Sequence, residues 1–432
     1  MLDKKFLREH PDEAKDALSR RGRDYVKLVD KFLALDEESR RTQKALNDLQ
    51  EDKNRASKEI AELQKAGKRQ EMAERIDQMK VLGMHVKAME EEFAEIAGKI
   101  ERLMLELPNI PHPSVPFGMA DSDKTIVSIW GEPRDLGFPA KDHLEIAARL
   151  GLIDFEAGAR VSGHGYYFFR GWGARLQQAI IQWMLDVHQN EHGYVQLSAP
   201  YLVLAEAMVG TGQLPKFADD MYGLEGGAMY LIPTAEVPVT NYHRDSIIEN
   251  LEEPIKYCAY TACFRREAGS YGKAVKGLIR VHQFDKVELV NFTTPHTSYE
   301  RHEGLTREAE EILKRLGLHF RRTLLPTGDM TFGSAKTYDL EVWLPSDGSW
   351  QEVSSSSNYE DFQARRANIR YRDPNTGKPF YAHTLNASGV ALPRLYAAIL
   401  ENYQTADGGV EIPPVLRDYL GGREKLTEAD RM

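Results

Sequence analysis

The stretch from about Tyr25 to Leu107 constrains the fold most strongly, because it has no proline, hardly any glycine and many Glu, Lys, Arg and Ala residues. Residues of these types favour helix. In its second half, apolar residues follow one another at mostly alternating steps of three and four. They are Met72, Ile76, Met79, Leu82, Val86, Met89, Phe93, Ile96, Ile100 and Leu103. This spacing is a heptad seam, which predicts a coiled coil.

The first half of the stretch carries a weaker seam of the same kind. Its members are Val26, Val29, Leu33, Leu46, Leu49, Ala56, Ile60 and Leu63, with Lys53 at a position that should be apolar. The only good break between the halves is Lys65–Lys68, where Gly67 permits a tight reversal. We therefore expect an antiparallel helical hairpin over residues 26–107, about 60 Å long at 1.5 Å per residue. An arm of this length cannot be buried against the rest of the chain along its whole length.

Two functions fit such an arm. It can be a spacer or dimerisation rod, or it can reach a large partner far from the body of the protein. Basic side chains that could contact phosphate groups are Arg40, Arg41, Lys44, Lys53, Arg55 and Lys58. Acidic residues such as Glu51 and Glu59 alternate with them, and a mixed-charge helix face is usually only solvated. Both interpretations stay open on periodicity alone.

The run Leu107–Pro113 contains three prolines and excludes helix, which marks the clearest domain boundary in the chain. We expect a helical arm over residues 1–108 and a second domain over residues 109–432. In the second domain the patterns predict helices over 174–188 and 306–316. Strands are predicted over 255–264, 278–291, 338–344 and 349–354. The order of these elements favours an antiparallel sheet rather than βαβ units.

Composition excludes several classes of protein. With 66 acidic and 56 basic residues the chain has a formal charge of −10, so any contact with nucleic acid requires a local basic patch. No apolar run reaches the roughly 18 residues of a membrane helix, and the charged N-terminus is unlike a signal peptide. The only cysteines, Cys258 and Cys263, are expected to be reduced thiols on neighbouring strands. Neither a P-loop nor a dinucleotide-binding glycine motif is present.

One cluster of charged residues interrupts the strand patterns. The strand over 255–264 runs into a charged turn that begins at Arg265, and the strand over 278–291 returns. Alternation along the returning strand places five side chains on one face, namely Arg280, His282, Phe284, Lys286 and Glu288. Arginine can hold a phosphate group, and a phenyl ring can lie against a heterocycle. The pattern favours a ligand-binding floor, and a surface strand with ordinary salt bridges is the alternative.

Longer motifs extend this cluster. Phe264-Arg265-x-Glu267 with the returning strand is similar to motif 2 of the class II aminoacyl-tRNA synthetases, and Gly389–Arg394 before a helix is similar to their motif 3. The helix over 174–188 and the strand after it correspond to motif 1, a dimer-interface element of that class. Further segments resemble the seryl-tRNA synthetase family, namely Gly210–Phe217, Ile232–Pro238, His282–Glu288, Asp361–Arg366 and His383–Asn386. The resemblance includes the arm and so spans nearly the whole chain.

The resemblance implies an α+β protein, with an N-terminal antiparallel α-helical coiled-coil hairpin followed by a class II catalytic domain whose mainly antiparallel β-sheet is flanked by helices. It also implies a homodimer that uses ATP and Mg²⁺. Such an enzyme activates L-serine as seryl-adenylate and transfers serine to the 3′ end of tRNA(Ser), and of tRNA(Sec) where such a tRNA exists. The basic residues of the arm would contact the tRNA. Neither DNA nor a membrane is an expected partner. The charged N-terminus, the lack of a membrane segment and the reduced cysteines predict a cytoplasmic protein.

By the same resemblance, Arg265 should hold the α-phosphate, Glu267 the adenine side and Arg394 the γ-phosphate end of ATP, so that these three residues are the expected catalytic set. Phe284 should stack on the base, and Glu352 with Ser355 should coordinate Mg²⁺. The full ATP site would comprise Arg265, Arg266, Glu267, Arg280, Val281, Phe284, Glu352, Val353, Ser354, Ser355 and Arg394.

The implied serine pocket is small and polar. Its residues would be Thr234, Ala235, Glu236, Arg265, Glu288 and Ser388. Taken alone, Thr234 to Glu236 also fits a helix N-cap followed by a first-turn acid. Pro393 and Tyr359 depart from the family pattern, although neither change removes a charge that the reaction needs.

Two other functions remain as alternatives. One is an enzyme that forms the adenylate but loads a carrier protein, which would leave the arm without a task. The other is a synthetase-like dimer retained as a non-catalytic regulatory protein. Its mark would be the loss of Arg265, Glu267, Glu352 or Arg394, and all four are present.

Overall fold

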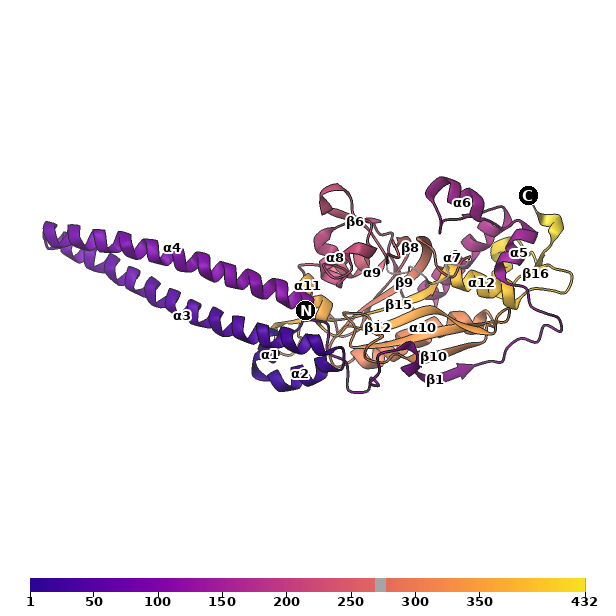
Figure 1. Cartoon of the computed structure of the whole chain (residues 1–432), viewed down its shortest axis with the longest axis horizontal. Coiled ribbons are helices and arrows are strands. Elements are labelled where there is room, and N and C mark those ends of the chain that lie inside the picture. Colours follow the sequence, from indigo (N-terminus) through magenta and orange to yellow (C-terminus); the bar gives the residue numbers. More distant parts are fainter. Residues whose placement is uncertain (269–276, 432) are drawn as a thin grey trace. The chain divides into compact units, whose positions relative to one another are not determined.

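The computed structural model of the 432-residue chain describes residues 1–268 and 277–431. The chain divides into two compact units, Leu2–Pro108 and a second unit that holds Met1 and Asn109–Met432 (Figure 1). Within the described residues, no helix is long and apolar enough to cross a membrane.

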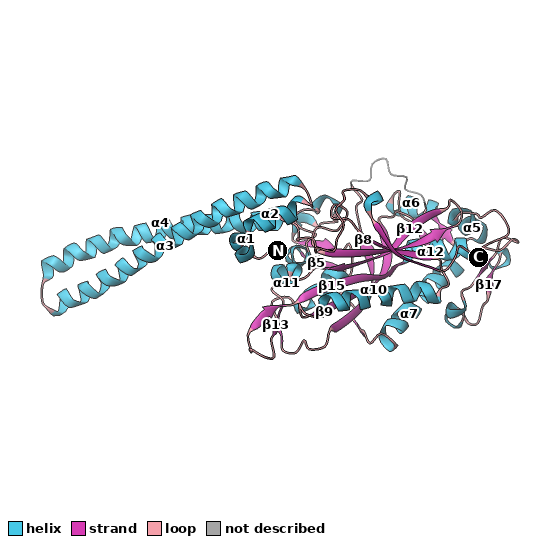
Figure 2. Cartoon of the chain, turned by 90° about the horizontal axis from the view of Figure 1, so that it is seen from below, coloured by secondary structure: helices cyan, strands magenta, loops and turns pink. Residues whose placement is uncertain are grey.

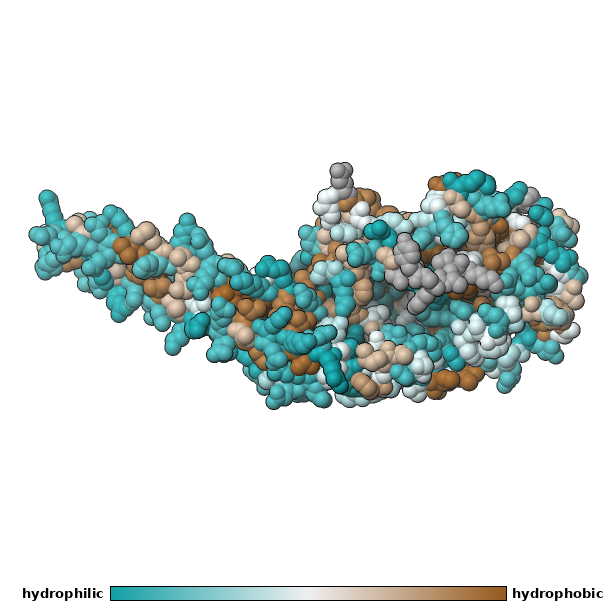
Figure 3. Space-filling view, viewed as in Figure 1, coloured by the Kyte–Doolittle hydropathy of each residue, from teal (hydrophilic) through white to brown (hydrophobic). Residues whose placement is uncertain are grey.

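The first unit consists of helices α1 (Lys4–Glu9), α2 (Pro11–Ser19), α3 (Arg23–Lys65) and α4 (Arg69–Glu106). Helices α3 and α4 run antiparallel along each other, and Gly67 makes the reversal with a left-handed φ of +71°. The predicted coiled-coil hairpin is therefore confirmed. The visible face of this unit is mostly hydrophilic, with apolar residues between the two helices (Figure 3).

The predicted seam is buried unevenly. Val29, Leu46, Val86 and Ile96 are buried, whereas Ile60, Leu63, Met72 and Ile76 near the turn are only half-buried. Asp36 explains the gap in the seam between Leu33 and Leu46. It is 6% exposed and accepts hydrogen bonds from Arg8 of α1, at 2.8 and 2.7 Å, and from Arg40 Nε at 3.0 Å. A buried carboxylate with these partners replaces an apolar contact.

The second unit is built on an eight-stranded sheet in the order β1-β10-β11-β12-β15-β9-β8-β4. Every neighbouring pair is antiparallel except β4 with β8, so the predicted mainly antiparallel sheet is confirmed (Figure 2). The strands are β1 (Thr125–Trp130), β4 (Val195–Gln196), β8 (Ile255–Phe264), β9 (Gln283–Thr293), β10 (Phe320–Leu324), β11 (Lys336–Leu344), β12 (Ser349–Asn358) and β15 (His383–Ala391).

Helices flank this sheet and bury its apolar side chains. Helix α10 (Ser298–Arg315) packs on β12 and β15, α12 (Leu392–Asn402) on β9 and β11, and α7 (Trp172–Asn190) on β8 and β9. One large core cluster contains buried residues of all three helices, among them Ile180, Leu305 and Tyr396. The order of strands and the helices around them make this an α+β unit.

Smaller elements surround the main sheet. The remaining α-helices are α5 (His143–Leu150), α6 (Phe155–Ser162), α8 (Ala205–Thr211), α9 (Glu236–Thr240) and α11 (Phe362–Ala367). The remaining strands are β2 (Ile153–Asp154), β3 (Phe168–Phe169), β5 (Leu202–Leu204), β6 (Met229–Leu231), β7 (Ile247–Ile248), β13 (Arg370–Arg372), β14 (Pro379–Tyr381), β16 (Val410–Glu411) and β17 (Lys425–Leu426).

Two predictions about the strands were wrong. The returning strand begins at Gln283 rather than Leu278, because the backbone N–H groups before it bond outside the ladder. Leu278 N donates to His143 Nε2 at 3.3 Å, and His282 N donates to the Gly165 carbonyl at 3.1 Å. Both cysteines lie on β8 rather than on neighbouring strands. Both are buried free thiols, and their spacing of five residues puts them on opposite faces.

Close packing of α7 gives a test of the fold. A Cβ added at Gly173 would lie 2.1 Å from the Leu152 carbonyl oxygen, so Gly173→Ala is expected to destabilise the second unit by about 1–3 kcal/mol. Gly83 on α4 is the matched control. Nothing lies within 4 Å of its added Cβ, and alanine there should stabilise the helix by about 1 kcal/mol. Thermal unfolding followed by circular dichroism measures both. Equal shifts of the melting temperature in the two variants would contradict this packing.

Candidate active site

The turn after β8 places the first charged residues of the site. Strands β8 and β9 pair through Phe264 and Gln283, and Arg265 N then donates to the His282 carbonyl at 2.8 Å. The guanidinium of Arg265 lies 5.1 Å from the centre of the Phe284 ring, and its Nε donates to the Pro233 carbonyl at 3.3 Å. Glu267 forms an ion pair with Arg280. The hairpin therefore presents two guanidinium groups, a carboxylate and an aromatic ring at one place.

The Arg394 cavity, of about 230 Å³, opens beside this hairpin. Its lining includes Arg265, Glu267, Arg280, Val281, Phe284, Lys286, Glu352, Val353, Ser388, Pro393 and Arg394. Arg394 lies in the first turn of α12. Its Nε donates to the Ile279 carbonyl at 3.0 Å, and its Nη1 donates to the Glu352 carbonyl at 2.8 Å. Pro393 occupies an early helical position where its missing N–H costs nothing, so this departure from the family pattern leaves Arg394 in place.

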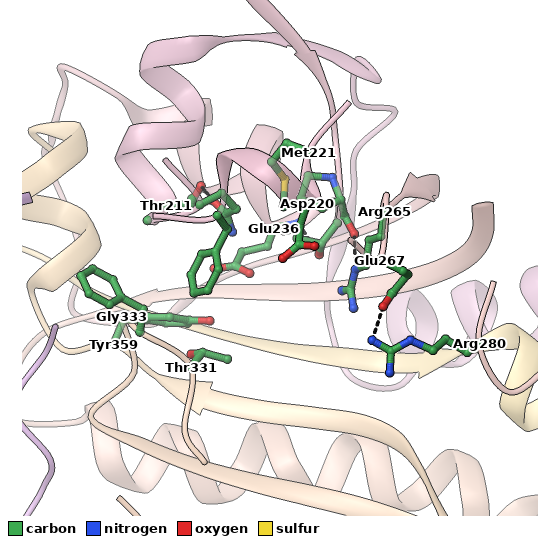
Figure 4. Close-up of a pocket in the computed structure, with 16 residues that line it drawn as sticks. Thr211, Asp220, Met221, Glu236, Arg265, Glu267, Arg280, Thr331, Gly333 and Tyr359 are labelled. Carbon is green, nitrogen blue, oxygen red and sulfur yellow. Dashed lines mark hydrogen bonds and ion pairs between the residues drawn. The ribbon is translucent and has the colours of Figure 1, made fainter. Parts of the chain in front are cut away.

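The Glu236 cavity has a volume of about 440 Å³, and Figure 4 shows residues that line it. Its lining includes Thr211, Gln213, Phe217, Asp220, Thr234, Glu236, Arg265, Glu267, Arg280, Thr331, Phe332 and Tyr359. Arg265, Glu267 and Arg280 line both cavities, and we call these three residues the shared wall. A molecule in one cavity and a molecule in the other would meet at this wall.

A buried polar cluster lies at the Glu236 cavity. Lys286 Nζ is 2.5 Å from Glu288 Oε2 and donates to Thr234 Oγ1 at 2.8 Å. Asn386 Nδ2 donates to Glu288 Oε1 at 3.0 Å, and Gln363 Nε2 donates to Glu236 Oε1 at 2.6 Å.

Two carboxylates and one ammonium in this buried cluster leave an excess of negative charge. Burial and the nearby Glu288 charge raise the pKa of Glu236 to about 7. Burial also raises the pKa of Glu288. The cluster is therefore suited to receive one further cation.

The structure brings most of the predicted site residues together. Thr234 and Glu236 line the Glu236 cavity, and Ser388 lines the Arg394 cavity opposite Glu288 in the β15–β9 register. The four charged residues on which the sequence interpretation depends, Arg265, Glu267, Glu352 and Arg394, all line the Arg394 cavity.

Other predicted residues lie outside both cavities. The Arg266 side chain is exposed. Ala235 is buried and is itself the N-cap of α9, so the interpretation of Thr234 as the N-cap was wrong, although Glu236 does lie in the first turn. Thr234 Oγ1 accepts from Glu236 N at 3.2 Å, one residue before the cap. Ser354 Oγ is turned inward and donates to the Ser388 carbonyl at 2.6 Å.

Residues beside Glu352 fit a divalent cation. The Glu352 side chain is 46% exposed at the cavity. Ser355 pairs with Asp339 across β12 and β11, and Asp339 Oδ1 is buried without a hydrogen-bond partner. Burial and the Glu352 charge hold the pKa of Asp339 well above its usual range. Magnesium prefers one or two carboxylates together with phosphate oxygens, which this surplus of negative charge suits.

The predicted basic residues of the arm differ in how freely their side chains could contact a phosphate group. Arg40 donates to Asp36, and Arg55 is paired with Asp52. Lys53 is half-buried on the seam, while Arg41, Lys44 and Lys58 are exposed.

Comparisons with known proteins identify both units. Residues 1–111 match the model of the seryl-tRNA synthetase N-terminal domain, and residues 224–403 match the class II core domain of the synthetases for G, H, P, S and T. The serine–tRNA ligases of Pelotomaculum thermopropionicum and Geobacillus kaustophilus are 50% and 51% identical to the chain, covering 99% of it and 100% of each relative.

The chain belongs to the seryl-tRNA synthetase family. The crystal structure of seryl-tRNA synthetase from Pyrococcus horikoshii complexed with ATP agrees with it at a TM-score of 0.92, with 37% identity over 99% of both chains. This family member retains four charged residues around one cavity, namely Arg265, Glu267, Glu352 and Arg394. Their presence argues against a non-catalytic regulatory protein.

Several residues of this family member's site escaped the sequence analysis. Thr331, Phe332 and Gly333 lie in a loop between β10 and β11 that carried no motif. Gln363 belongs to a motif that was used only as a family signature, and Tyr359 was noticed only as a departure. The only sequence feature that pointed to Tyr359 and Gln363 was their position shortly after the serine run 354–357. This position did not predict that Gln363 would contact Glu236.

Proposed function

We propose that this chain attaches L-serine to tRNA(Ser) in two steps, with ATP as the energy source. The observation that carries the proposal is the pair of adjoining cavities with a shared wall of Arg265, Glu267 and Arg280. The buried carboxylate of the Glu236 cavity suits the ammonium group of an amino acid, and the guanidinium groups and the Phe284 ring of the Arg394 cavity suit a nucleotide.

In the first step a carboxylate oxygen of serine attacks the α-phosphorus of ATP. A new P–O bond forms, the bond to pyrophosphate breaks, and seryl-adenylate and pyrophosphate result. Negative charge accumulates on the oxygens of the α-phosphate, and Arg265 on the shared wall neutralises it. In the second step a ribose hydroxyl of the terminal tRNA nucleotide attacks the acyl carbon, and AMP leaves. Positioning and charge neutralisation supply most of the rate enhancement in such reactions.

Within the Arg394 cavity, Phe284 stacks on the adenine, Glu267 contacts the adenine side and Arg394 holds the γ-phosphate. The position of Arg394 in the first turn of α12 adds the positive end of a helix dipole. When Mg²⁺ is bound, it screens the phosphate charges, and Glu352 with Ser355 would hold it.

The amino acid is recognised by charge and by hydrogen bonding. Glu236 receives the α-ammonium group, Arg265 contacts the carboxylate, and Glu288 with Thr234 binds the side-chain hydroxyl. Ser388 lies opposite Glu288 in the β15–β9 register, on the side of the Arg394 cavity, and completes the serine pocket from there. A pocket that hydrogen-bonds a hydroxyl rejects alanine strongly, because its own buried polar groups are then left unpaired.

A homodimer in the cytoplasm is part of the proposal. Both edge strands of the main sheet carry exposed apolar side chains, among them Ile126, Ile129 and Trp130 on β1 and Val195 on β4. Unpaired sheet edges with exposed apolar side chains favour association with another chain. The buried free thiols Cys258 and Cys263 fit a reducing compartment. Sedimentation equilibrium should give twice the mass of one chain.

Pyrophosphate exchange into ATP across a panel of amino acids tests the proposed activation step. We expect exchange with serine, much weaker exchange with threonine and none with alanine. Charging of purified tRNA(Ser) then separates the synthetase from an enzyme that loads a carrier protein. Absence of serine-dependent exchange would reject the activity itself.

A further inference from the structure

Gln363 of α11 is buried beside the Glu236 cavity and binds three separate elements. Its Nε2 donates to Glu236 Oε1 at 2.6 Å and lies 3.3 Å from the Thr211 carbonyl oxygen. Its Oε1 accepts from Thr384 Oγ1 of β15 at 2.7 Å. Gln363 is 1% exposed and Thr384 is fully buried. Every polar atom of this amide therefore has a partner inside the protein.

The orientation of the amide follows from its neighbours. The Thr211 carbonyl can only accept a hydrogen bond, and an ionised Glu236 can only accept one. The nitrogen must face these two oxygens, and the amide oxygen must face the Thr384 hydroxyl. Gln363 thus offers Glu236 a donor that is fixed in direction by residues on both sides.

Burial and the charge of Glu288 oppose the ionisation of Glu236, whereas the hydrogen bond from Gln363, the charge of Lys286 and a hydrogen bond with Tyr359 favour it. Glu288 places a second buried carboxylate nearby, and only Lys286, already 2.5 Å from Glu288, brings a cation from the same strand. Tyr359 faces Glu236 from the segment after β12, and Asp220, Arg265, Glu267 and Arg280 line the same cavity. A hydrogen bond to a carboxylate favours its ionised form.

We infer that Gln363, oriented by Thr384, is a positioning residue that keeps the Glu236 carboxylate ionised and aimed at the α-ammonium group of the amino acid. The inference rests on the proposed function, because it assigns Glu236 to the amino-acid ammonium. Gln363 lines neither cavity and acts only through Glu236.

Loss of the donor has a defined consequence for pH dependence. Without Gln363 the pKa of Glu236 rises above its present value of about 7, so a smaller fraction is ionised at neutral pH. Serine binding then weakens at pH 7 and recovers as the pH is raised. The acid limb of kcat/KM for serine moves to higher pH, while ATP binding in the other cavity is unaffected.

Gln363→Met, which has a similar length but no donor, tests the inference in serine-dependent pyrophosphate exchange. We expect KM for serine at pH 7 to rise about tenfold to a hundredfold, the range for losing a hydrogen bond to a charged group. KM for ATP should change less than about twofold. Gln70→Met, an exposed substitution at the start of α4, is the matched control.

A second pair of variants tests the orienting contact without touching Gln363. Thr384→Val keeps the shape but removes the hydroxyl, and it should shift the acid limb in the same direction by a smaller amount. Thr384→Ser restores a hydroxyl and should recover most of the loss. This pair keeps the inference testable if Gln363→Met fails to fold.

Two results would overturn the inference. One is a change in KM for serine and ATP by equal factors, and the other is a loss of kcat with an unmoved acid limb. Both would indicate general damage to the site. Failure of the proposed function is a different observation, because the unsubstituted protein would then show no exchange with serine at any pH.

Discussion

Replacing Arg265 with alanine is expected to slow seryl-adenylate formation by at least about a hundredfold, the effect of removing one preorganised charge stabiliser. Arg265 belongs to the shared wall and is held by the Pro233 carbonyl and the Phe284 ring, so its guanidinium is already in place when the substrates bind. The measurement is serine-dependent pyrophosphate exchange under saturating ATP.

Two further variants make this experiment specific. Arg265→Lys keeps the charge but loses the planar fork, so we expect an intermediate rate. Arg307→Ala removes an exposed arginine of α10 and controls for the loss of one positive charge. If Arg265→Ala exchanged pyrophosphate as fast as the unsubstituted protein, the assignment of Arg265 to the α-phosphate would be wrong.

Removing the outer arm is expected to abolish tRNA charging and leave serine activation nearly intact. Gln50 Nε2 of α3 lies 3.4 Å from Glu90 Oε1 of α4. Because the two helices are antiparallel, residue 40 of α3 lies beside about residue 100 of α4. Deletion of residues 40–99, with a short Gly-Ser turn between the stumps, therefore shortens both helices equally. The two readouts are pyrophosphate exchange and aminoacylation of tRNA(Ser).

Charge substitutions distinguish an arm that contacts tRNA from an arm that is only a spacer or dimerisation rod. Arg41, Lys44 and Lys58 are exposed, so changing all three to Gln should weaken tRNA binding and reduce its dependence on salt, while the hairpin keeps its length. A spacer or dimerisation rod would tolerate this change. Equal loss of exchange and charging in the deletion variant would show that the arm does not have a separate task.

Elements with a local cause were predicted well from sequence. The strand Ile255–Phe264 has its predicted bounds, and the hairpin reverses at Gly67 as expected, because alternation, heptads and glycine act over a few residues. The returning strand was predicted too long, since Leu278 and His282 bond to His143 and Gly165, which lie more than a hundred residues away in the sequence. No local pattern reports such partners.

The residues of the candidate site also divide into those that the sequence predicted and those that it did not. Arg265, Glu267 and Arg394 were predicted because each belongs to a motif, Glu352 was predicted from the family resemblance, and all four line one cavity. Thr331 belongs to no motif, and the motif that contains Gln363 identified the family without assigning this residue a role. The hydrogen bond from Gln363 to Glu236 joins residues 127 positions apart in the sequence. Its effect on the ionisation of Glu236 depends on burial, which sequence alone does not determine.

The shared wall of Arg265, Glu267 and Arg280 has a consequence for inhibition. Because one set of side chains borders both cavities, a single molecule that carries a serine-like group and an adenosine-like group joined by a non-hydrolysable bridge can occupy both cavities at once. Its second half binds at a high effective concentration once the first half is seated, so it should bind far more tightly than either fragment.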